Sequence, residues 1–291
     1  MPDDYLHGHP EPVLRSHRWR TAENSSGHLL EHLRPTDVLL DVGCGPGTIT
    51  VDLASRVARA IGVDASADVV AAADRTAVDR AGPDRAGSDR AGPGAGSGPA
   101  VSFGAADVAS LPFADGTFDV VHIHQVLQHL RDPVAALREA ARVLRPGGLL
   151  SVRESDYGGF TWAPEPPGVA RWRDRYRSVA RSLGADPDAG RHLLGWCRDA
   201  GLEEMTASAS VWCFAGEDRE WWAGVWIDRL RTDPLRSRLV GDGADDDEIE
   251  SMVQGFSEWG ASPDGWFAVL HGEVRVVTDV VGAVFVGDRK S

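Results

Sequence analysis

Residues 37–47 read DVLLDVGCGPG and decide the fold. The apolar run 37–42 leads into three glycines, at positions 43, 45 and 47, and a helix-like segment, TITVDLASRVA, follows at 48–58. Strand, glycine turn and helix in this order predict the first unit of an α/β sheet. The glycines let the backbone turn tightly and approach a ligand closely. They alternate as GxGxG, whereas a pyrophosphate-binding fingerprint reads GxGxxG. An acid, Asp41, precedes them, and an aspartate on the ligand side suits a cationic ligand better than a diphosphate.

The alternation of apolar runs and helix-like segments continues beyond this unit. We expect further strands at 58–66, 101–107, 118–124 and 147–155, and further helices at 67–78 and 132–144. The pattern predicts a parallel sheet with helices on both faces and a ligand crevice at the carboxyl ends of the strands. Residues 79–99 form an imperfect DRAG repeat rich in Gly and Pro. Such a segment buries too little apolar surface to offset its chain entropy, so we expect a flexible low-complexity insertion there.

Two further acids stand at the ends of the next two predicted strands. Asp64 ends the second strand, and a carboxylate at that position can accept hydrogen bonds from both hydroxyls of a ribose. Asp107 ends the third strand, where it can accept a hydrogen bond from an exocyclic amine such as that of adenine, with Val108 packing against the ring. Because the carboxyl ends of parallel strands lie at one edge, we expect both acids beside the glycine turn.

In order, these segments resemble the motif series of the class I S-adenosylmethionine-dependent methyltransferases, especially the ubiquinone/menaquinone-biosynthesis-type branch. The matching stretches over residues 36–156 are LLDVGCGPG, IGVDAS, AADVASLPFADGTFDVV, LQHLRDP and RVLRPGG. The resemblance implies an α/β, Rossmann-like methyltransferase sheet, mostly parallel with an antiparallel last strand. It implies S-adenosyl-L-methionine as cofactor and S-adenosyl-L-homocysteine as product, with the glycine loop holding the methionine moiety, the second acid the ribose and the third acid the adenine amine. The predicted cofactor-binding residues are Arg20, Asp41, Gly43, Cys44, Gly45, Gly47, Asp64, Ala65, Asp107, Val108, Ile123 and His124.

The end of the fourth predicted strand, HIHQ at 122–125, lies beside the expected position of the transferring methyl group. His124 is the candidate catalytic residue, because a histidine with a pKa near 6.5 can take a proton from a hydroxyl as methyl transfer proceeds. Proximity and orientation alone supply most of the rate of many methyl transfers, so a dedicated base is not required and His124 could instead line the pocket. Gln125 is placed to contact the acceptor.

Polar residues crowd the predicted pocket mouth after the fifth strand, and the chain beyond residue 160 holds nine of the ten tryptophans. Glu154 and Tyr157 are candidates for acceptor contact, the alternative being a solvated rim. Trp162 is a candidate for an apolar wall of the acceptor site, the alternative being core packing. We expect helical cover over 157–200 and 217–262, with helices at 169–183, 190–200, 219–239 and 246–259. The runs 205–214 and 265–278 would complete the sheet as an antiparallel pair.

The segment before the first strand has helical spacing over 17–33, and we expect residues 1–35 to form an N-terminal helical lid on a methyltransferase domain of 36–291. Arg18 or Arg20 could pair with the cofactor carboxylate if the lid folds over it, because arginine suits bidentate carboxylate binding. The alternative is a solvated helix face.

Composition limits the possible partners. The net charge of −14, with no long basic cluster, makes a nucleic acid a poor partner and a small-molecule acceptor a better one. No stretch approaches the roughly 20 apolar residues that span a bilayer, and the first residues lack a signal-peptide pattern, so we expect no membrane contact and a cytoplasmic location. The three cysteines, at 44, 197 and 213, are too far apart to suggest a disulfide framework or a zinc site.

We therefore expect transfer of a methyl group to O, N or C of a small organic metabolite, aromatic or polyketide-like, as in secondary metabolism. Two other classes stay open. One is a protein of the same fold whose bound cofactor assists a dehydration or cyclisation. The other is a non-enzymatic binding module, against which the acids at 41, 64 and 107 argue.

Overall fold

A computed structural model of the chain describes residues 11–81 and 100–278. The first ten residues of the predicted lid and most of the predicted insertion lie outside these ranges. Residues 79–81, which we assigned to the insertion, are instead the last turn of a helix that begins at Ala67.

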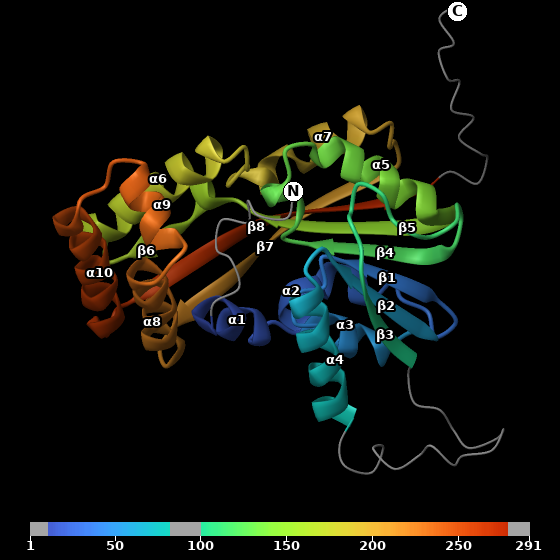
Figure 1. The fold of residues 1–291 in the computed structure, drawn as a ribbon, viewed down its shortest axis with the longest axis horizontal. Helices are drawn as coiled ribbons and strands as arrows, with labels where there is room; N and C mark the ends of the chain where they lie inside the picture. Colours follow the sequence, from blue (N-terminus) through green and yellow to red (C-terminus); the bar gives the residue numbers. More distant parts are fainter. Residues whose placement is uncertain (1–10, 82–99, 279–291) are drawn as a thin grey trace, which may run out of the picture.

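A mixed sheet forms the centre of the molecule (Figure 1). Its strands run in the order β3-β2-β1-β4-β5-β8-β6, and β7 pairs with the other edge of β8. The first five are parallel, whereas β8 is antiparallel to β5, and β6 and β7 are antiparallel to β8. The expected Rossmann-like sheet with antiparallel C-terminal strands is therefore confirmed. The strands are β1 (Val38–Val42), β2 (Arg59–Asp64), β3 (Ala100–Ala105), β4 (Phe118–His124), β5 (Leu144–Ser155), β6 (Thr161–Ala163), β7 (Met205–Ala215) and β8 (Trp266–Val277).

Helices cover both faces of the parallel strands because the residues of each strand alternate between them. Leu39, Ala60 and Val120 face α2 (Ala22–Leu30) and α3 (Thr48–Ala54) in one buried cluster. Leu40 and Val121 face α5 (Pro133–Val143) and α7 (Leu193–Asp199) in another. Figure 1 shows these two pairs on opposite sides of the sheet. The other described helices are α1 (Glu11–Arg18), α4 (Ala67–Ala81), α6 (Pro167–Ser182), α8 (Asp218–Arg231), α9 (Leu235–Gly241) and α10 (Asp246–Ala261), with 3-10 turns η3 (Leu127–His129), η4 (Tyr157–Gly159) and η5 (Ala189–His192).

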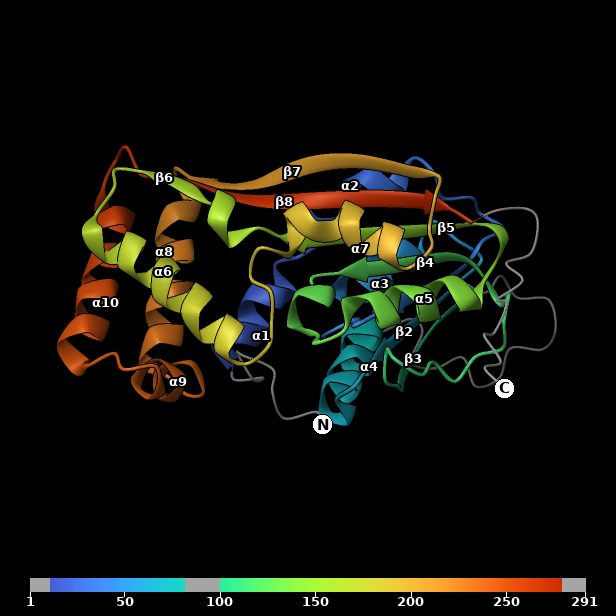
Figure 2. The same ribbon diagram turned by 90° about the horizontal axis from the view of Figure 1, so that it is seen from above.

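A second layer of structure, which we call the helical cluster, consists of α6, α8, α9 and α10. It packs against the far ends of β7 and β8, away from the parallel strands (Figures 1 and 2). Its core is aromatic, with Trp172, Trp226 and Trp259 each at most 1% exposed. β8 joins the two parts, because residues 271–277 pair with β5 while 266–268 pair with β6. Of the helices within the ranges predicted as cover, α6, α8, α9 and α10 form the helical cluster, whereas α7 packs beside α5 on the sheet.

Two of the predicted helices are each divided in two. The N-terminal one stops at Arg18 and restarts after Thr21, whose side chain caps the second helix together with Asn24. The predicted helix 219–239 ends at Arg231 and restarts at Leu235, because Pro234 cannot continue a helix. No helix within the described ranges is long and apolar enough to cross a membrane.

Candidate active site

The glycine turn joins β1 to α3, as its sequence predicts. Gly43, Gly45 and Gly47 have φ of +71°, +55° and +78°, which L side chains rarely adopt. A Cβ at Gly43 would lie 2.2 Å from Val126 Cγ2, so this position needs glycine for packing as well. A Cβ at Gly45 would meet no atom within 4 Å. The backbone at Gly45 therefore faces open space that a ligand can enter.

Two of the three predicted acids lie at the strand ends beside this turn. The Asp64 carboxylate accepts hydrogen bonds from the backbone N–H of Gly45 at 3.1 Å and of Ser66 at 3.0 Å. Asp107 is exposed, and its carboxylate accepts from the N–H of Ala109 at 2.9 Å. Because β2 and β3 are paired and parallel, both acids stand at the same edge of the sheet as the glycine turn.

Asp41 and two of its neighbours, Cys44 and Ile123, are buried. Asp41 is 3% exposed, and its carboxylate is bound by the hydroxyl of Thr50 and by His122 Nδ1 at 2.7 Å. Ile123 is fully buried in the sheet core, and Cys44 is buried with burial raising the pKa of its thiol. The expectation that Asp41 lies on the ligand side is therefore corrected, because Thr50 and His122 hold its carboxylate and Asp41 braces the strand that carries the glycine turn. The cofactor contact of Ile123 stays a prediction. Ala65 is exposed after β2, and Val108 is half-buried after β3.

Polar side chains of the sheet and of α2 form a continuous buried stripe where that helix packs on the sheet. His122 bonds Ser26 Oγ through Nε2 at 2.9 Å, and Ser151 Oγ bonds His28 Nε2 at 2.8 Å. His28 lies 3.5 Å from Glu273, which forms a buried ion pair with Arg153 at 3.2 Å. Burial lowers the pKa of His28 to about 4. We call this set the polar stripe; it consists of Ser26, His28, Asp41, His122, His124, Ser151, Arg153, His271 and Glu273.

His124, the predicted catalytic residue, belongs to this stripe. Its Nε2 accepts a hydrogen bond from Arg153 Nη1 at 2.9 Å, and the ring is 5% exposed. Burial lowers the pKa of His124 well below its usual value, and the charges of Arg20 and Arg153 lower it further. A nitrogen that already accepts from a guanidinium cannot take a proton from an acceptor, so this geometry argues against the predicted general-base role. The imidazole instead orients Arg153.

Glu154 does not lie at a pocket mouth, which corrects the expectation of acceptor contact. Its side chain is fully buried and accepts hydrogen bonds from the backbone N–H groups of Val126, Leu127 and Gln128, at 2.8, 2.7 and 3.3 Å. Burial raises the pKa of this carboxyl to about 8, although the three amides act in the opposite direction. Glu154 therefore fixes the turn that follows β4.

That turn holds Gln125 in an unusual conformation. Gln125 has φ +54°, which makes it the one non-glycine residue with positive φ in the described ranges. Its Oε1 accepts from Arg20 Nη2 at 2.7 Å, and its Nε2 lies 2.8 Å from His271 Nε2. Such strained backbones concentrate at functional sites. Gln125 is thus positioned from both sides, at the carboxyl end of β4.

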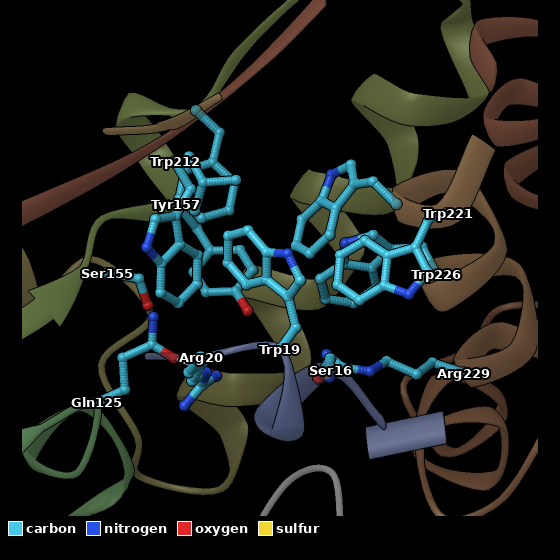
Figure 3. Close-up of a pocket in the computed structure, with 13 residues that line it drawn as sticks. Ser16, Trp19, Arg20, Gln125, Ser155, Tyr157, Trp212, Trp221, Trp226 and Arg229 are labelled. Atoms are coloured by element: carbon cyan, nitrogen blue, oxygen red, sulfur yellow. Dashed lines mark hydrogen bonds between the residues drawn. The ribbon is translucent and has the colours of Figure 1, made fainter. Parts of the chain in front are cut away.

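Gln125 also lines a narrow cavity walled mainly by aromatic rings, which we call the tryptophan pocket (Figure 3). Its walls come from α1, the α1–α2 link, the ends of β4 and β5, η4, β7, α8 and β8. Tyr157 lines this pocket, whereas Trp162, on β6, is buried against Phe267 of β8, with ring centroids 5.4 Å apart. The lining residues are Ser16, Trp19, Arg20, Gln125, Ser155, Tyr157, Phe160, Trp212, Trp221, Trp222, Trp226, Arg229 and Val269.

The segment between α1 and α2 adjoins both the glycine turn and the tryptophan pocket. At one end, Thr48 Oγ1, in the first turn of α3, donates to the carbonyl oxygen of His17 at 3.3 Å. At the other, Trp19 packs edge-on against Trp212 at 5.3 Å, and the Arg20 guanidinium lies 5.4 Å from the Trp212 ring centroid. The Arg20 guanidinium also donates to Gln125 Oε1, and its predicted pairing with the cofactor carboxylate stays a prediction. The segment therefore contacts both the start of the helix that follows the glycine turn and the wall of the tryptophan pocket.

Several residues of the site were not predicted from the sequence: Ser16, Trp19, His28, His122, Arg153, Trp212, Arg229, His271 and Glu273. Alternation within strands was the available signal for some of them. In β4 the histidines at 122 and 124 alternate with apolar residues, and in β5 Ser151 and Arg153 do the same. Alternating polar positions in a strand buried on both faces indicate an internal polar contact surface.

Comparisons with known proteins identify the family of the chain. A family described as "Methyltransferase domain" matches residues 40–152. The chain is 35% identical to an uncharacterized methyltransferase of Schizosaccharomyces pombe, over 93% of this chain and 95% of the relative. It is 30% identical to the "probable methyltransferase ltbC" of Aspergillus luteorubrus, over 92% of this chain and 95% of the relative.

Two more distant similarities concern part of the chain or its fold. A 27-O-demethylrifamycin SV methyltransferase of Amycolatopsis mediterranei is 33% identical over 60% of this chain and 57% of the relative. The crystal structure of the YcgJ protein from Bacillus subtilis superposes with a TM-score of 0.57 at 17% identity, covering 87% of this chain and 97% of that one. The latter shows that the two proteins share a fold.

Proposed function

The chain belongs to the class I S-adenosylmethionine-dependent methyltransferases, and from that premise we propose that it methylates a small aromatic or polyketide-like molecule at O, N or C. S-adenosyl-L-methionine is its cofactor. The observation that carries the proposal is the junction at Gln125, where the strand ends that carry the cofactor-binding motifs meet the tryptophan pocket.

The residues at the glycine turn fit this cofactor. Gly45 leaves open space at the backbone, which the methionine moiety would need for close approach. Asp64 offers an anionic acceptor of the kind that two ribose hydroxyls require, and exposed Asp107 offers one to an exocyclic amine. We propose that Gly45, Asp64, Ala65, Asp107 and Val108 contact the cofactor. Gly43, Gly47, Asp41 and Cys44 shape the turn from inside.

An aromatic acceptor is favoured by the pocket that adjoins this site. Seven of its thirteen lining side chains are Trp, Tyr or Phe, and planar rings pack well against such walls. The name of the rifamycin relative records a small-molecule acceptor, which is consistent with this class. Gln125 and Tyr157 lie where an acceptor would contact them, and Gln125 is preoriented by Arg20 and His271.

The bound cofactor supplies an electrophilic methyl group, and the chain's own residues supply position. Arg20, Gln125 and His271 form a connected polar floor, while Trp19 and Trp212 exclude water above it. Fixing two reactants in line accounts for much of the rate of such reactions. His124 holds Arg153 rather than moving a proton.

The proposal is tested by supplying the protein with S-adenosylmethionine and a panel of hydroxylated naphthalenes, naphthoquinols and phenols. We expect at least one to gain a methyl group, with an equal amount of S-adenosylhomocysteine released, and no such release by Asp64→Ala. Conversion of a panel compound without release of S-adenosylhomocysteine would instead indicate a protein that catalyses dehydration or cyclisation. If the protein binds the cofactor but releases S-adenosylhomocysteine with no member of the panel, the aromatic acceptor class is contradicted.

A further inference from the structure

The Gln125 side chain makes two hydrogen bonds whose directions are fixed by chemistry. Its Oε1 lies 2.7 Å from Arg20 Nη2, and because a guanidinium can only donate, this atom of Gln125 must be the amide oxygen. The amide nitrogen therefore faces His271 Nε2, at 2.8 Å, and since an amide nitrogen also only donates, the imidazole nitrogen accepts. His271 is thus neutral, with its proton on Nδ1. It is fully buried, and burial lowers its pKa well below the usual value, in agreement with the neutral form.

Gln125 keeps one hydrogen-bond donor for a ligand. An amide nitrogen carries two hydrogens, and the bond to His271 uses one of them. Within the described part of the chain, Nε2 makes no second hydrogen bond. Gln125 lines the tryptophan pocket directly after β4, where the proposed function puts the reacting end of the methyl acceptor. The second N–H of Gln125 can therefore bind an oxygen of that molecule.

The nearby side chains that could take a proton from the methyl acceptor are already engaged. His271 Nε2 accepts from Gln125, and His124 Nε2 accepts from Arg153 at 2.9 Å. Glu154 accepts from three backbone N–H groups of the turn that follows β4. None of these three groups is placed to act as the base for a hydroxyl. A hydroxyl at this position therefore loses its proton to water, to the extent that its surroundings favour the anion.

The charge around Gln125 favours an anion. The Arg20 guanidinium, bonded to Gln125, is always charged, whereas Arg153 is neutralised by its ion pair with Glu273 at 3.2 Å. Burial raises the pKa of the Glu154 carboxyl to about 8, so this group is mostly uncharged at neutral pH. No aspartate or glutamate stands among the described residues that line the tryptophan pocket. The sum is positive, and a nearby positive charge stabilises the ionised form of a hydroxyl.

We propose that the methyl acceptor reacts as an oxyanion, such as a phenolate, and that its oxygen accepts the second N–H of Gln125. His271 is the positioning residue that turns this N–H toward the oxygen. The inference rests on the proposed function and narrows it to methylation at oxygen. The hydroxyl proton leaves to water first; the oxygen–carbon bond then forms as the carbon–sulfur bond breaks, and the electron pair of that bond stays on sulfur. The products are an uncharged ether and an uncharged thioether.

The ionisation of a bound phenol tests the inference on the unmodified protein. 4-Nitrophenol is suitable because its phenolate is yellow whereas the phenol is colourless, so both forms can be measured while they are bound. When it is titrated with S-adenosylhomocysteine present, bound 4-nitrophenol should have an ionisation constant at least tenfold greater than in free solution. An unchanged or smaller ionisation constant, or no binding, would overturn the proposal.

Gln125→Glu separates the donor from the rest of the pocket. Glutamate has the shape of glutamine but carries an oxygen in place of the amide nitrogen, so the N–H is lost and a negative charge is added. The ionisation constant of bound 4-nitrophenol should then fall to that of the free phenol or below. Gln254→Glu is the matched control, because it makes the same change at an exposed position of α10, where Gln254 contacts Glu258, and it should keep the parent value. A Gln125→Glu variant that keeps the enhanced ionisation would contradict the role of the N–H.

His271→Phe tests the positioning role, because phenylalanine fills the space of the imidazole but accepts no hydrogen bond. It should lower kcat at least tenfold and reduce the enhanced ionisation of bound 4-nitrophenol, which a loss of packing alone would not do. His271→Gln, whose side-chain oxygen can accept from Gln125, should restore part of both properties. Unchanged ionisation in His271→Phe would count against the positioning role. If this variant proves unfolded by near-ultraviolet circular dichroism, His271→Gln and the titration of the unmodified chain still decide.

Failure of the proposed function gives a different pattern. It would appear as absent binding of S-adenosylmethionine or absent methyl transfer, neither of which the ionisation of 4-nitrophenol measures. Methylation of a panel compound at carbon, with its hydroxyl groups unchanged, would contradict the oxyanion while leaving the proposed function intact.

Discussion

Gly45 is the residue at which the cofactor site can be changed with least effect on packing. Its φ is +55°, and a Cβ there would meet no atom within 4 Å. Gly45→Ala should therefore lower the free energy of unfolding by only about 1–2 kcal/mol, the cost of the left-handed conformation. The added methyl group would enter the ligand space, so the affinity for S-adenosylmethionine should fall at least tenfold in calorimetric titration.

Gly216→Ala is the matched control, because Gly216 has φ +56° and equally open surroundings, at the turn after β7. It should lose similar stability and keep full cofactor affinity. If both variants bind the cofactor as the parent does, the open space at Gly45 is not the methionine site.

Glu154 gives a second prediction at this scale, in the pH dependence of stability. Burial raises the pKa of this carboxyl to about 8, whereas an unfolded glutamate titrates near about 4.3. As pH rises between these values the unfolded chain releases the proton first, so the contribution of Glu154 to stability declines. The difference in unfolding free energy between parent and Glu154→Gln should therefore shrink from pH 5 to pH 8.

Glu139 provides the opposite case, because its hydrogen bond to Arg142 lowers the pKa of that carboxyl. The stability that Glu139 contributes should be present at neutral pH and lost progressively as pH falls below about 4.3, where an unfolded glutamate titrates. Urea titrations of Glu139→Gln against the parent would show this loss. For Glu154 the contradicting result is a difference in unfolding free energy between parent and Glu154→Gln that does not vary with pH. It would mean that Glu154 is ionised throughout this range.

The sequence located strand ends well and side-chain directions poorly. The glycine turn, Asp64 and Asp107 follow from motif order, and they lie where predicted. His124 and Glu154 were assigned to the ligand side because they end strands. In the structure Arg153 and three backbone amides engage them, and these partners come from different strands or from a turn. Contacts of that kind depend on strand register, which one sequence does not reveal.

At the scale of elements, the N-terminal pair of helices shows how a cap outweighs helical spacing. The apolar spacing over 17–33 predicts one helix. In the structure a new helix begins after Thr21, because the Thr21 hydroxyl accepts from the N–H of Asn24 and the Asn24 side-chain oxygen accepts from the N–H of Thr21. This capping box uses Asn where Glu or Gln is usual, so the pattern was not recognised. The break places Trp19 and Arg20 in the link that faces the pocket.

Thr21→Ala should therefore lower the free energy of unfolding by about 1 kcal/mol, the typical cost of losing such a cap. Amide hydrogen exchange over Ala22–Leu30 should accelerate, because these amides lie in the helix that the cap begins. Thr21→Ser keeps the hydroxyl and should restore both properties. Unchanged exchange in Thr21→Ala would show that α2 is held by its buried contacts with the sheet instead.

At the scale of the whole molecule, two separately packed parts share one sheet. The glycine turn belongs to the parallel strands, whereas most of the aromatic wall of the pocket belongs to the helical cluster and to β7. The sequence indicated this division through the accumulation of tryptophans after residue 160. It did not indicate which tryptophans face the pocket, because Trp162 and Trp212 both lie on strands and differ only in what packs against them.

Gly255→Ala tests the division. α6 and α10 approach closely there, and a Cβ at Gly255 would lie 2.8 Å from the Cα of Gly168. The overlap should lower the free energy of unfolding by about 1–3 kcal/mol. It should also slow methyl transfer to the acceptor identified from the panel, while leaving the affinity for S-adenosylmethionine within twofold.

Gly195→Ala is the control, since a Cβ at this helical position meets nothing within 4 Å and alanine favours helix. It should be neutral or stabilising. Loss of cofactor affinity by the same factor as the loss of methyl transfer in Gly255→Ala would show that the two parts respond as one unit.

The central claim, a cofactor site built on the glycine turn and Asp64, is tested most directly by calorimetric titration with S-adenosylmethionine and S-adenosylhomocysteine. The parent chain and Asp68→Ala, which changes an exposed acid on α4, should bind both at micromolar concentration. Asp64→Ala should bind neither, because the ribose loses its carboxylate partner. Absence of binding by the parent, or unchanged binding by Asp64→Ala, would contradict the claim.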